Sequence, residues 1–536
     1  MIEVQNLAKV FIDKKLFQDV NLKFTEGNTY GIIGANGAGK STFLKILAGQ
    51  VEPTSGSVIV GKNQRISVLE QDHFQYDQVN VTDLVIQGNQ ELHQIQEAKN
   101  AIYLNPEADE ADYAKAAELE ELFGQMGGWN AENDAQILLN ALGIAEAKQQ
   151  VLMKDLKSTE KVKVLLARAL FGNPDILIMD EPTNHLDLKA IKWLINFIND
   201  YDKIVIVVSH DSDFLDEICT NIVDIDFGKA KMFTGNYSFW KESSQLLAEL
   251  QKQSNLKKQE QIEKLQAFIA RFSANASKSK QATSRKKALE KIILDEIVPS
   301  TRKYPFIRFN VNKNPGKQIL EVQNLAYKDP QNTVLFAEVS FTLRPGDKVA
   351  IIGDDDIAKT KFLEILAGQE SQYEGQFKWG QTIQTEYFPI DNSSYFDSNL
   401  KMIDWLRLWP VDNEKAEDQD ISDHRMRSFL GKMLFSGESV FKEVSNLSGG
   451  EKARLMFARM MLRDANCLLF DQPLEHLDSE SIDAVIEAIN KYESIVLFTT
   501  YNHALIKEAN VIFELKNNAS YIFRGTLAEY EEKMGY

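Results

Sequence analysis

Short apolar runs and segments with helical periodicity follow one another along this chain. The run "YGII" at 30–33 predicts a strand, and "STFLKILAG" at 41–49 directly after it predicts a helix. The run "DILIMD" at 175–180 predicts a second buried strand. The pattern therefore indicates an α/β domain.

The same pattern occurs twice. Residues 17–50 align with residues 336–369 almost without gaps, and residues 165–187 align with residues 456–478. We therefore predict two tandem copies of one α/β domain, at 1–237 and 318–536. The two blocks lie 28 residues closer together in the second copy than in the first, so the first copy should carry an insertion between them. We place it at about 88–135 as two polar helices, which form either a solvated excursion or a docking arm.

Residues 238–317 belong to neither copy. Apolar residues recur there at helical spacing, stop at a polar stretch, and then resume until Pro299 and Pro305. This predicts a linker of two helices in an antiparallel hairpin, with its tip at 273–285. The periodic positions are Leu246, Leu247, Leu250, Ile262, Leu265, Ile269, Phe272, Leu289, Ile292, Ile293 and Ile297.

Composition narrows the class of protein. Of the 536 residues, 44% are apolar and only 12 are proline, which favours a globular chain. The two cysteines, Cys219 and Cys467, lie far apart and imply neither a disulfide framework nor a metal cluster. Apolar stretches are too short for a membrane span, and the N-terminus lacks the pattern of a signal peptide, so we expect a cytoplasmic protein without membrane contact.

Charge is distributed unevenly. The net charge is −18, yet residues 241–310 carry 15 Lys or Arg against 7 Asp or Glu. A solvated, charged coiled coil is one interpretation, and contact with a phosphate backbone is the other. The candidate RNA-binding residues are Arg271, Lys278, Lys280, Arg285, Lys286 and Lys287.

A phosphate-binding loop follows the first strand. "GANGAGKS" at 34–41 matches G-x-x-x-x-G-K-[ST] between a strand and a helix, the context in which this pattern binds nucleotides. Its glycines let backbone N–H groups surround phosphates, Lys40 reaches the terminal phosphates, and Ser41 can bind Mg²⁺. The predicted ATP-binding residues here are Gly34, Ala35, Asn36, Gly37, Ala38, Gly39, Lys40, Ser41 and Thr42.

Polar residues at two strand ends complete a candidate catalytic set. Asp180 ends an apolar strand, where a carboxylate suits Mg²⁺ or its water shell. Glu181 is placed to activate a hydrolytic water, although an acidic pair at this point also suits a helix N-cap. His210, at the end of "VIVVSH", is a candidate sensor of the terminal phosphate or a structural histidine.

Together these motifs resemble ATP-binding cassette (ABC) proteins. They match a Walker A loop at 34–41, a Q-loop at Gln71, a Walker B strand at 176–181, a D-loop at 185–187 and a switch at His210. The resemblance implies that Phe11 stacks on adenine and that Gln71 joins Ser41 and Asp180 around Mg²⁺. The signature "LSGGE" supplies the further ATP-binding residues Leu447, Ser448, Gly449, Gly450 and Glu451.

Two cassettes around a basic hairpin resemble the ABC-F family of translation factors, and "RFSANASKSKQATSR" with "PFIRF" is similar to its bacterial YbiT-type branch. The resemblance implies a monomer whose cassettes close head to tail around two ATPs. It also implies an ATPase that binds the ribosome at the exit site, contacts rRNA and P-site tRNA through the linker, and regulates translation. The alternatives are an ATPase of DNA or chromosome maintenance and the energising subunit of a transporter.

Measured against the family pattern, the second copy is degenerate. Its Walker A loop reads "GDDDIAKT", and the first signature reads "LKSTE" without glycines. By the head-to-tail rule all these losses fall in one composite site, where we expect no ordinary triphosphate binding. The three aspartates reflect drift in an unneeded site, form an acidic first turn that stabilises the following helix, or do both; a third alternative is that they bind a metal. The residues concerned are Asp354, Asp355, Asp356, Lys359, Thr360, Gln472 and Tyr501.

Overall fold

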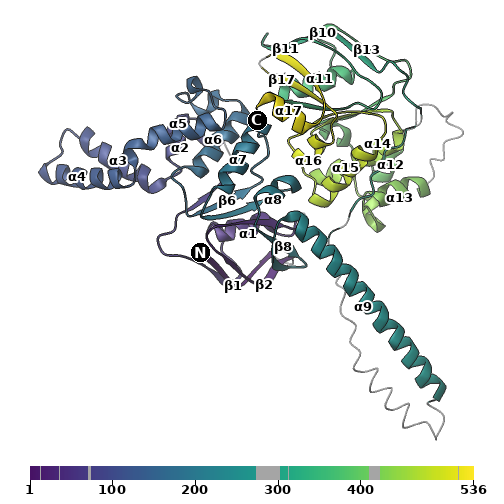
Figure 1. Cartoon of the computed structure of the whole chain (residues 1–536), viewed down its shortest axis with the longest axis horizontal. Helices are drawn as coiled ribbons and strands as arrows, with labels where there is room; N and C mark the ends of the chain where they lie inside the picture. Colours follow the sequence, from purple (N-terminus) through teal and green to yellow (C-terminus); the bar gives the residue numbers. More distant parts are fainter. Residues whose placement is uncertain are drawn as a thin grey trace.

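The structure is a computed structural model that describes residues 1–11, 14–35, 37–70, 74–272, 302, 304–311, 313–409, 423–516 and 518–535. Two α/β units of the same topology lie side by side, and we call them the first and second cassettes (Figure 1). A long helix, α9 (Tyr237–Phe272), projects away from both. Within the described residues, no helix is long and apolar enough to cross a membrane.

The main sheet of the first cassette has the strand order β5-β6-β7-β3-β8-β9. Its first five strands run parallel, and β9 closes the edge antiparallel to β8. Strands β6 and β7 are buried almost throughout, as expected for a parallel sheet covered on both faces. The bounds are Ile66–Val68 (β5), Ile176–Asp180 (β6), Ile204–Val208 (β7), Asn28–Ile33 (β3), Asn221–Asp226 (β8) and Lys229–Thr234 (β9).

An antiparallel sheet of order β2-β1-β4 and a set of α-helices complete the first cassette. The strands are Ile2–Phe11 (β1), Lys14–Phe24 (β2) and Ser55–Val60 (β4). The helices are Lys40–Leu47 (α1), Val81–Ile86 (α2), Gln90–Leu104 (α3), Glu110–Gln125 (α4), Ala131–Ala141 (α5), Ser158–Leu170 (α6), Leu188–Asn199 (α7) and Ser212–Ile218 (α8). Helices α3 and α4 lie where the sequence predicts two polar helices, and they protrude from the cassette (Figure 1).

The second cassette repeats this plan. Its sheets have the orders β14-β15-β16-β12-β17-β18 and β11-β10-β13. The strands are Leu320–Lys328 (β10), Val334–Thr342 (β11), Lys348–Gly353 (β12), Glu374–Trp379 (β13), Thr385–Phe388 (β14), Cys467–Asp471 (β15), Ile495–Thr499 (β16), Val511–Lys516 (β17) and Ala519–Arg524 (β18). The helices are Asp356–Leu366 (α11), Met402–Leu406 (α12), Asp423–Lys432 (α13), Gly449–Arg463 (α14), Ser479–Lys491 (α15), His503–Lys507 (α16) and Leu527–Met534 (α17).

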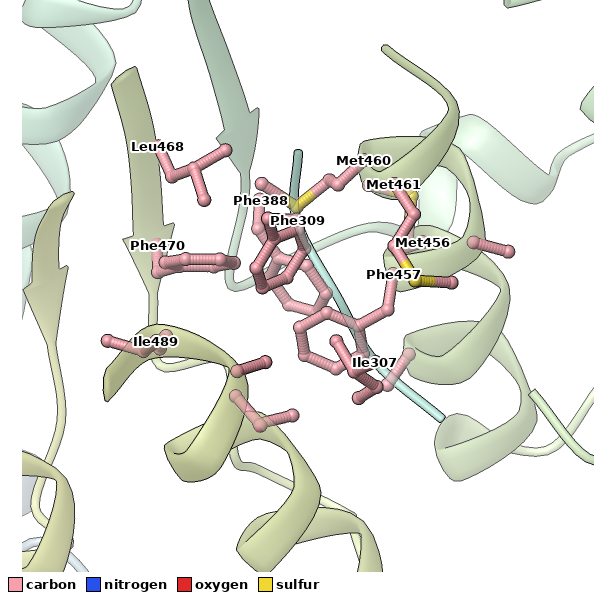
Figure 2. Close-up of a cluster of buried hydrophobic side chains, with 14 of the residues drawn as sticks. Ile307, Phe309, Phe388, Met456, Phe457, Met460, Met461, Leu468, Phe470 and Ile489 are labelled. Carbon is pink, nitrogen blue, oxygen red and sulfur yellow. The ribbon is translucent and has the colours of Figure 1, made fainter. Parts of the chain in front are cut away.

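The core of the second cassette begins before residue 318. Ile307 and Phe309, which the sequence-based boundaries assign to the linker, are buried among side chains of β14, β15, α14 and α15 (Figure 2). The Phe309 ring lies 5.7 Å from the ring of Phe470, centroid to centroid. In "PFIRF" the alternate residues Ile307 and Phe309 are buried while Phe306 and Arg308 are exposed, the two-residue period of an extended chain on a core. The end of the predicted linker is therefore part of the second cassette.

Candidate active site

The first phosphate loop lies at the carboxyl edge of the main sheet. Strand β3 ends at Ile33, and helix α1 begins at Lys40. Gly37 and Gly39 have φ values of 76° and 102°, a left-handed region that side chains with a Cβ rarely adopt. Among the described residues no side chain caps α1, so the N–H groups of its first turn are available to an anion.

Lys40 lies inside this loop. Its side chain is buried, and Nζ donates a hydrogen bond to the carbonyl oxygen of Gly34 at 2.7 Å. Burial lowers the pKa of Lys40, while the nearby carboxylates of Glu181 and Glu480 oppose that shift. Gly34, Ala35, Gly37, Ala38 and Gly39 precede this lysine in the loop, and Ser41 and Thr42 follow it in the first turn of α1. Asn36 and Gln71 lie outside the described residues.

Glu181 and His210 meet at the ends of neighbouring strands. β6 ends at Asp180 and β7 at Val208, and the two strands pair in register. Oε1 of Glu181 is buried and has no hydrogen bond to any part of the chain that the structure describes. It lies 3.6 Å from Nε2 of His210, whose backbone N–H donates to the other carboxylate oxygen at 3.2 Å. An orphaned carboxylate oxygen at this edge fits a water molecule or a cation as partner.

Burial shifts both side chains toward their neutral forms. It raises the pKa of Glu181 to about 8, with a smaller opposing effect from the His210 backbone N–H. It lowers the pKa of His210 to about 3, and the positive charge of Lys40 acts in the same direction. At neutral pH the imidazole is therefore uncharged in this state.

The second cassette reaches into the first site through the start of α15. Nδ1 of His210 lies 2.7 Å from Oγ of Ser479, the first residue of that helix. The carboxylates of Asp478 and Glu480 act on Lys40, His210 or both. Ser479 is a site residue that the motif comparison missed, although it directly follows "HLD" of the second D-loop.

The remaining predicted nucleotide contacts are Phe11 of the first cassette and the signature of the second. Phe11 ends β1 and is half exposed, with the Lys9 ammonium 5.0 Å from its ring centre. In the signature "LSGGE", Leu447 is buried, and Ser448 caps helix α14, which begins at Gly449. Glu451 closes this capping box, since its carboxylate accepts a hydrogen bond from the Ser448 N–H at 2.8 Å and pairs with Lys442 at 3.1 Å.

In the second cassette the phosphate loop has become helix. Helix α11 begins at Asp356, three residues before Lys359, whereas α1 begins at the equivalent Lys40. Asp355 is its N-cap, and its carboxylate accepts a hydrogen bond from the N–H of Ala358 at 3.1 Å. The helix-capping interpretation therefore holds for Asp355, and Asp356 lies in the first turn of the helix. The positions of the lost glycines now form a helical turn, which leaves no loop to surround a phosphate.

Lys359 contacts two neighbouring side chains. The buried lysine pairs with Asp356 at 2.8 Å, and its Nζ lies 4.5 Å from the ring centre of Tyr501. The Tyr501 hydroxyl donates to the same Asp356 carboxylate. In the aligned blocks Gln472 takes the position of Glu181, and both have a positive φ near 50°. The second cassette therefore has an amide where the first has a carboxylate. Thr360 follows Lys359 in α11.

An ion pair also joins the cassettes here. Nζ of Lys157, in the degenerate signature "LKSTE", lies 2.5 Å from Oδ2 of Asp355. Burial alone would raise the pKa of Asp355, but the hydrogen bonds from Lys157 and Ala358 outweigh it and lower that pKa. Asp355 and Asp356 thus each pair with a lysine, and among the described residues no group of three His, Cys, Asp or Glu side chains is arranged to hold a metal ion.

Most of the predicted RNA-binding residues lie outside the described residues. Arg271 lies near the end of α9, and its backbone alone is described. Lys278, Lys280, Arg285, Lys286 and Lys287 fall outside the described residues.

Comparisons with known proteins agree with this architecture. A family model described as ABC transporter matches residues 17–184 and 336–475, and a second model of that description matches 223–309. The chain is 49% identical to "Uncharacterized ABC transporter ATP-binding protein YkpA" of Bacillus subtilis, over 97% of this chain and 95% of the relative. It is 38% identical to "Probable ATP-binding protein YbiT" of Escherichia coli O157:H7 over the full length of both.

A plant relative and a solved structure extend the comparison. The chain is 30% identical to "ABC transporter F family member 5" of Arabidopsis thaliana, over 99% of this chain and 77% of the relative. The solved structure of "RNase-L Inhibitor" matches with a TM-score of 0.59 at 20% identity, over 99% of this chain and 93% of that chain, and shows the shared fold. The chain is therefore an ATP-binding ATPase with two tandem cassettes, and it belongs to the ABC-F type of the ATP-binding cassette proteins.

Proposed function

We propose that this ATPase uses one competent ATP site to bind to and leave the ribosome, and thereby regulates translation in the cytoplasm. The observation that carries the single-site proposal is the contrast between the two phosphate loops. The first has glycines in left-handed conformations and an uncapped helix N-terminus, while the second is a helical turn capped by Asp355. We assign hydrolysis to the first site, with the signature at 447–451 supplied by the second cassette.

Within this site each residue has a separate task. Lys40 would exchange the Gly34 carbonyl for the terminal phosphates, and Phe11 would stack on the base. Ser41 and Asp180, with Gln71, would hold Mg²⁺, which neutralises phosphate charge when it is bound. Glu181, once ionised, accepts a proton from the attacking water, and the neutral imidazole of His210 donates a hydrogen bond to the γ-phosphate.

The proposed partner follows from charge. The segment 241–310 has a net charge of +8 in a chain of −18, and its first part is the projecting helix α9. A basic segment on an otherwise acidic protein suits rRNA and tRNA, because phosphates require Lys or Arg. The fold is shared with a solved complex that contains "archaeal ribosome recycling factor aABCE1", with a TM-score of 0.57 at 18% identity. As the resemblance to ABC-F translation factors implies, we propose that the linker lies at the ribosomal exit site, beside rRNA and P-site tRNA.

Co-sedimentation with 70S ribosomes in ATP tests this function. We expect Glu181→Gln, which cannot complete hydrolysis, to remain bound where the wild-type chain dissociates. Neutralising Lys278, Lys280, Arg285 and Lys286 to Gln should weaken binding and flatten its salt dependence. The matched control neutralises four lysines on the first cassette, Lys23, Lys62, Lys229 and Lys231, and should retain the steep dependence.

Binding of Glu181→Gln to duplex DNA as strong as its binding to ribosomes would overturn the proposal. That result would favour the chromosome-maintenance alternative.

A further inference from the structure

The linker returns to the cassettes at Arg302. The guanidinium of this residue is buried, with 10% of the side chain exposed. It contacts three elements at once: Asp224 on β8 of the first cassette, Glu480 on α15 of the second, and the ring of Trp240 on α9. One side chain thus joins both cassettes and both ends of the linker.

The geometry uses the planar fork of arginine. Nη2 and Nη1 donate to the two carboxylate oxygens of Asp224 at 2.6 and 3.4 Å. Nε lies 2.8 Å from Oε1 of Glu480, and the guanidinium carbon lies 4.5 Å from the ring centre of Trp240. A lysine ammonium cannot reach two carboxylates and stack on a ring in this arrangement.

Both carboxylates lie beside a direct neighbour of the first ATP site or beside one of its residues. Asp224 pairs with Ile33 in the ladder between β3 and β8, and Ile33 directly precedes Gly34 of the phosphate loop. Glu480 directly follows Ser479, whose hydroxyl contacts the imidazole of His210. The Arg302 bridge therefore spans the site from the phosphate loop to the residue that contacts His210.

This bridge depends on the two cassettes being together. If they separate, α15 carries Glu480 away from β8, and Arg302 retains at most one of these two carboxylates. In the closed arrangement burial raises the pKa of both Asp224 and Glu480, and the positive charge of Arg302 counteracts it. Without the arginine, closure would bury both carboxylates without the cation that they share, which is unfavourable, whereas separated cassettes leave them open to water.

We propose that Arg302 is a positioning residue for ATP hydrolysis, which holds α15 of the second cassette against the phosphate loop of the first. The linker thereby stabilises the closed form of the site. The proposal rests on the ATPase activity of the chain and not on its placement at the ribosome.

The two nucleotides ADP and AMP-PNP separate this role from a general structural one. ADP lacks the γ-phosphate and occupies the phosphate loop of one cassette, while AMP-PNP also engages the opposing signature and so benefits from closure. We expect Arg302→Gln to weaken AMP-PNP binding by about tenfold or more and ADP binding by less than twofold, as measured by isothermal titration calorimetry. Arg302→Lys should lie between, and the exposed Arg308 of the same segment gives a matched control, Arg308→Gln, with wild-type affinities.

A second substitution makes the test specific to charge. In Arg302→Gln/Glu480→Gln one of the two stranded carboxylates is neutral, so AMP-PNP affinity should recover in part. Glu480→Gln alone should show the same AMP-PNP-selective loss in smaller degree. Because it keeps the ion pair between Arg302 and Asp224, it provides the test if Arg302→Gln does not fold. In Arg302→Gln, a loss for AMP-PNP less than fivefold larger than the loss for ADP overturns the proposal. If only Glu480→Gln folds, equal losses for the two nucleotides overturn it.

Discussion

The ammonium of Lys157 lies 2.5 Å from the carboxylate of Asp355, and this ion pair joins the N-cap residue of a degenerate signature helix to the degenerate phosphate loop opposite. In an intact composite site a nucleotide phosphate would lie between these two elements. Here a side-chain carboxylate occupies that place and is neutralised by a lysine of the other cassette. A direct contact between protein side chains therefore joins the two cassettes at the second interface.

Charge reversal tests this contact. Lys157→Glu should separate the cassettes at the second site, because it places a carboxylate against Asp355, and Lys157→Glu/Asp355→Lys should restore the contact. Distances between spin labels on α6 and α11, measured without nucleotide, report it. Equal label distances in the wild-type chain and Lys157→Glu would contradict the prediction.

Stability separates the two roles of Asp355. Asp355→Asn keeps an N-cap side chain for α11 and loses the ion pair, which is partly exposed, so we expect a loss of about 0–1 kcal/mol in the free energy of unfolding. Asp355→Ala also loses the N-cap, so its loss in the free energy of unfolding should be larger by about 1 kcal/mol. Urea denaturation measures both, and Lys157→Met provides the control that removes the ion pair alone. Equal stabilities of the Asn and Ala variants would contradict a capping role.

Nucleotide stoichiometry tests the single site. We expect one ATP per chain in Glu181→Gln, because residues 356–358 are helical and Lys359 already pairs with Asp356. Native mass spectrometry counts the bound nucleotides, and Lys40→Ala/Glu181→Gln, which lacks the phosphate-loop lysine, should bind none. Two equally occupied ATPs would show that the second site still binds nucleotide.

Much of the fold and of the first site can be predicted from the sequence motifs, because phosphate loops and strand-end carboxylates occur in fixed local contexts. The motifs do not predict the contacts between the two cassettes. The role of Lys157 depends on the head-to-tail arrangement and on a helix that begins three residues early, which follows from the loss of Gly37 and Gly39 equivalents. Ser479 and Arg302 belong to no motif, since their respective partners in the other part of the chain, His210 and Glu480, lie more than 170 residues away in sequence.

The linker boundary fails for a related physical reason. Its prediction uses helical periodicity, which ends near Pro299, and then extends to the start of the repeat. The buried residues of "PFIRF" alternate with a period of two over only five positions, too few to identify an extended segment from sequence.

Glu181→Gln should abolish most ATP turnover, by roughly 10²- to 10⁴-fold, because glutamine cannot accept a proton. In the wild-type chain kcat/KM should rise with pH up to about 8, where the free carboxyl ionises. A phosphate-release assay from pH 6 to 9 measures both. A flat profile would remove Glu181 from the proton-accepting role.

The same carboxyl affects stability with a defined sign. Its pKa is about 8 when folded and near 4.5 when unfolded, so between these values the folded chain holds the extra proton. Its contribution to the free energy of unfolding is fully present below pH 4.5 and is lost as the pH rises through 8. Between these values the slope approaches ~1.4 kcal/mol per pH unit. Relative to wild type, nucleotide-free Glu181→Gln should therefore gain stability from pH 5 to 8 in urea denaturation. A constant difference would contradict the raised pKa.

Phe309 provides the test of the boundary of the second cassette. Its ring is buried against Phe470 and Tyr492, so Phe309→Ala should leave a cavity and lower the unfolding free energy of that cassette by about 3–5 kcal/mol. Phe306 lies three residues earlier and is 56% exposed, so Phe306→Ala should change stability by less than about 1 kcal/mol. Denaturation followed by hydrogen exchange of β15 and β16 reports this cassette specifically. If the segment only connects the linker to the fold, both variants will unfold like the wild-type chain.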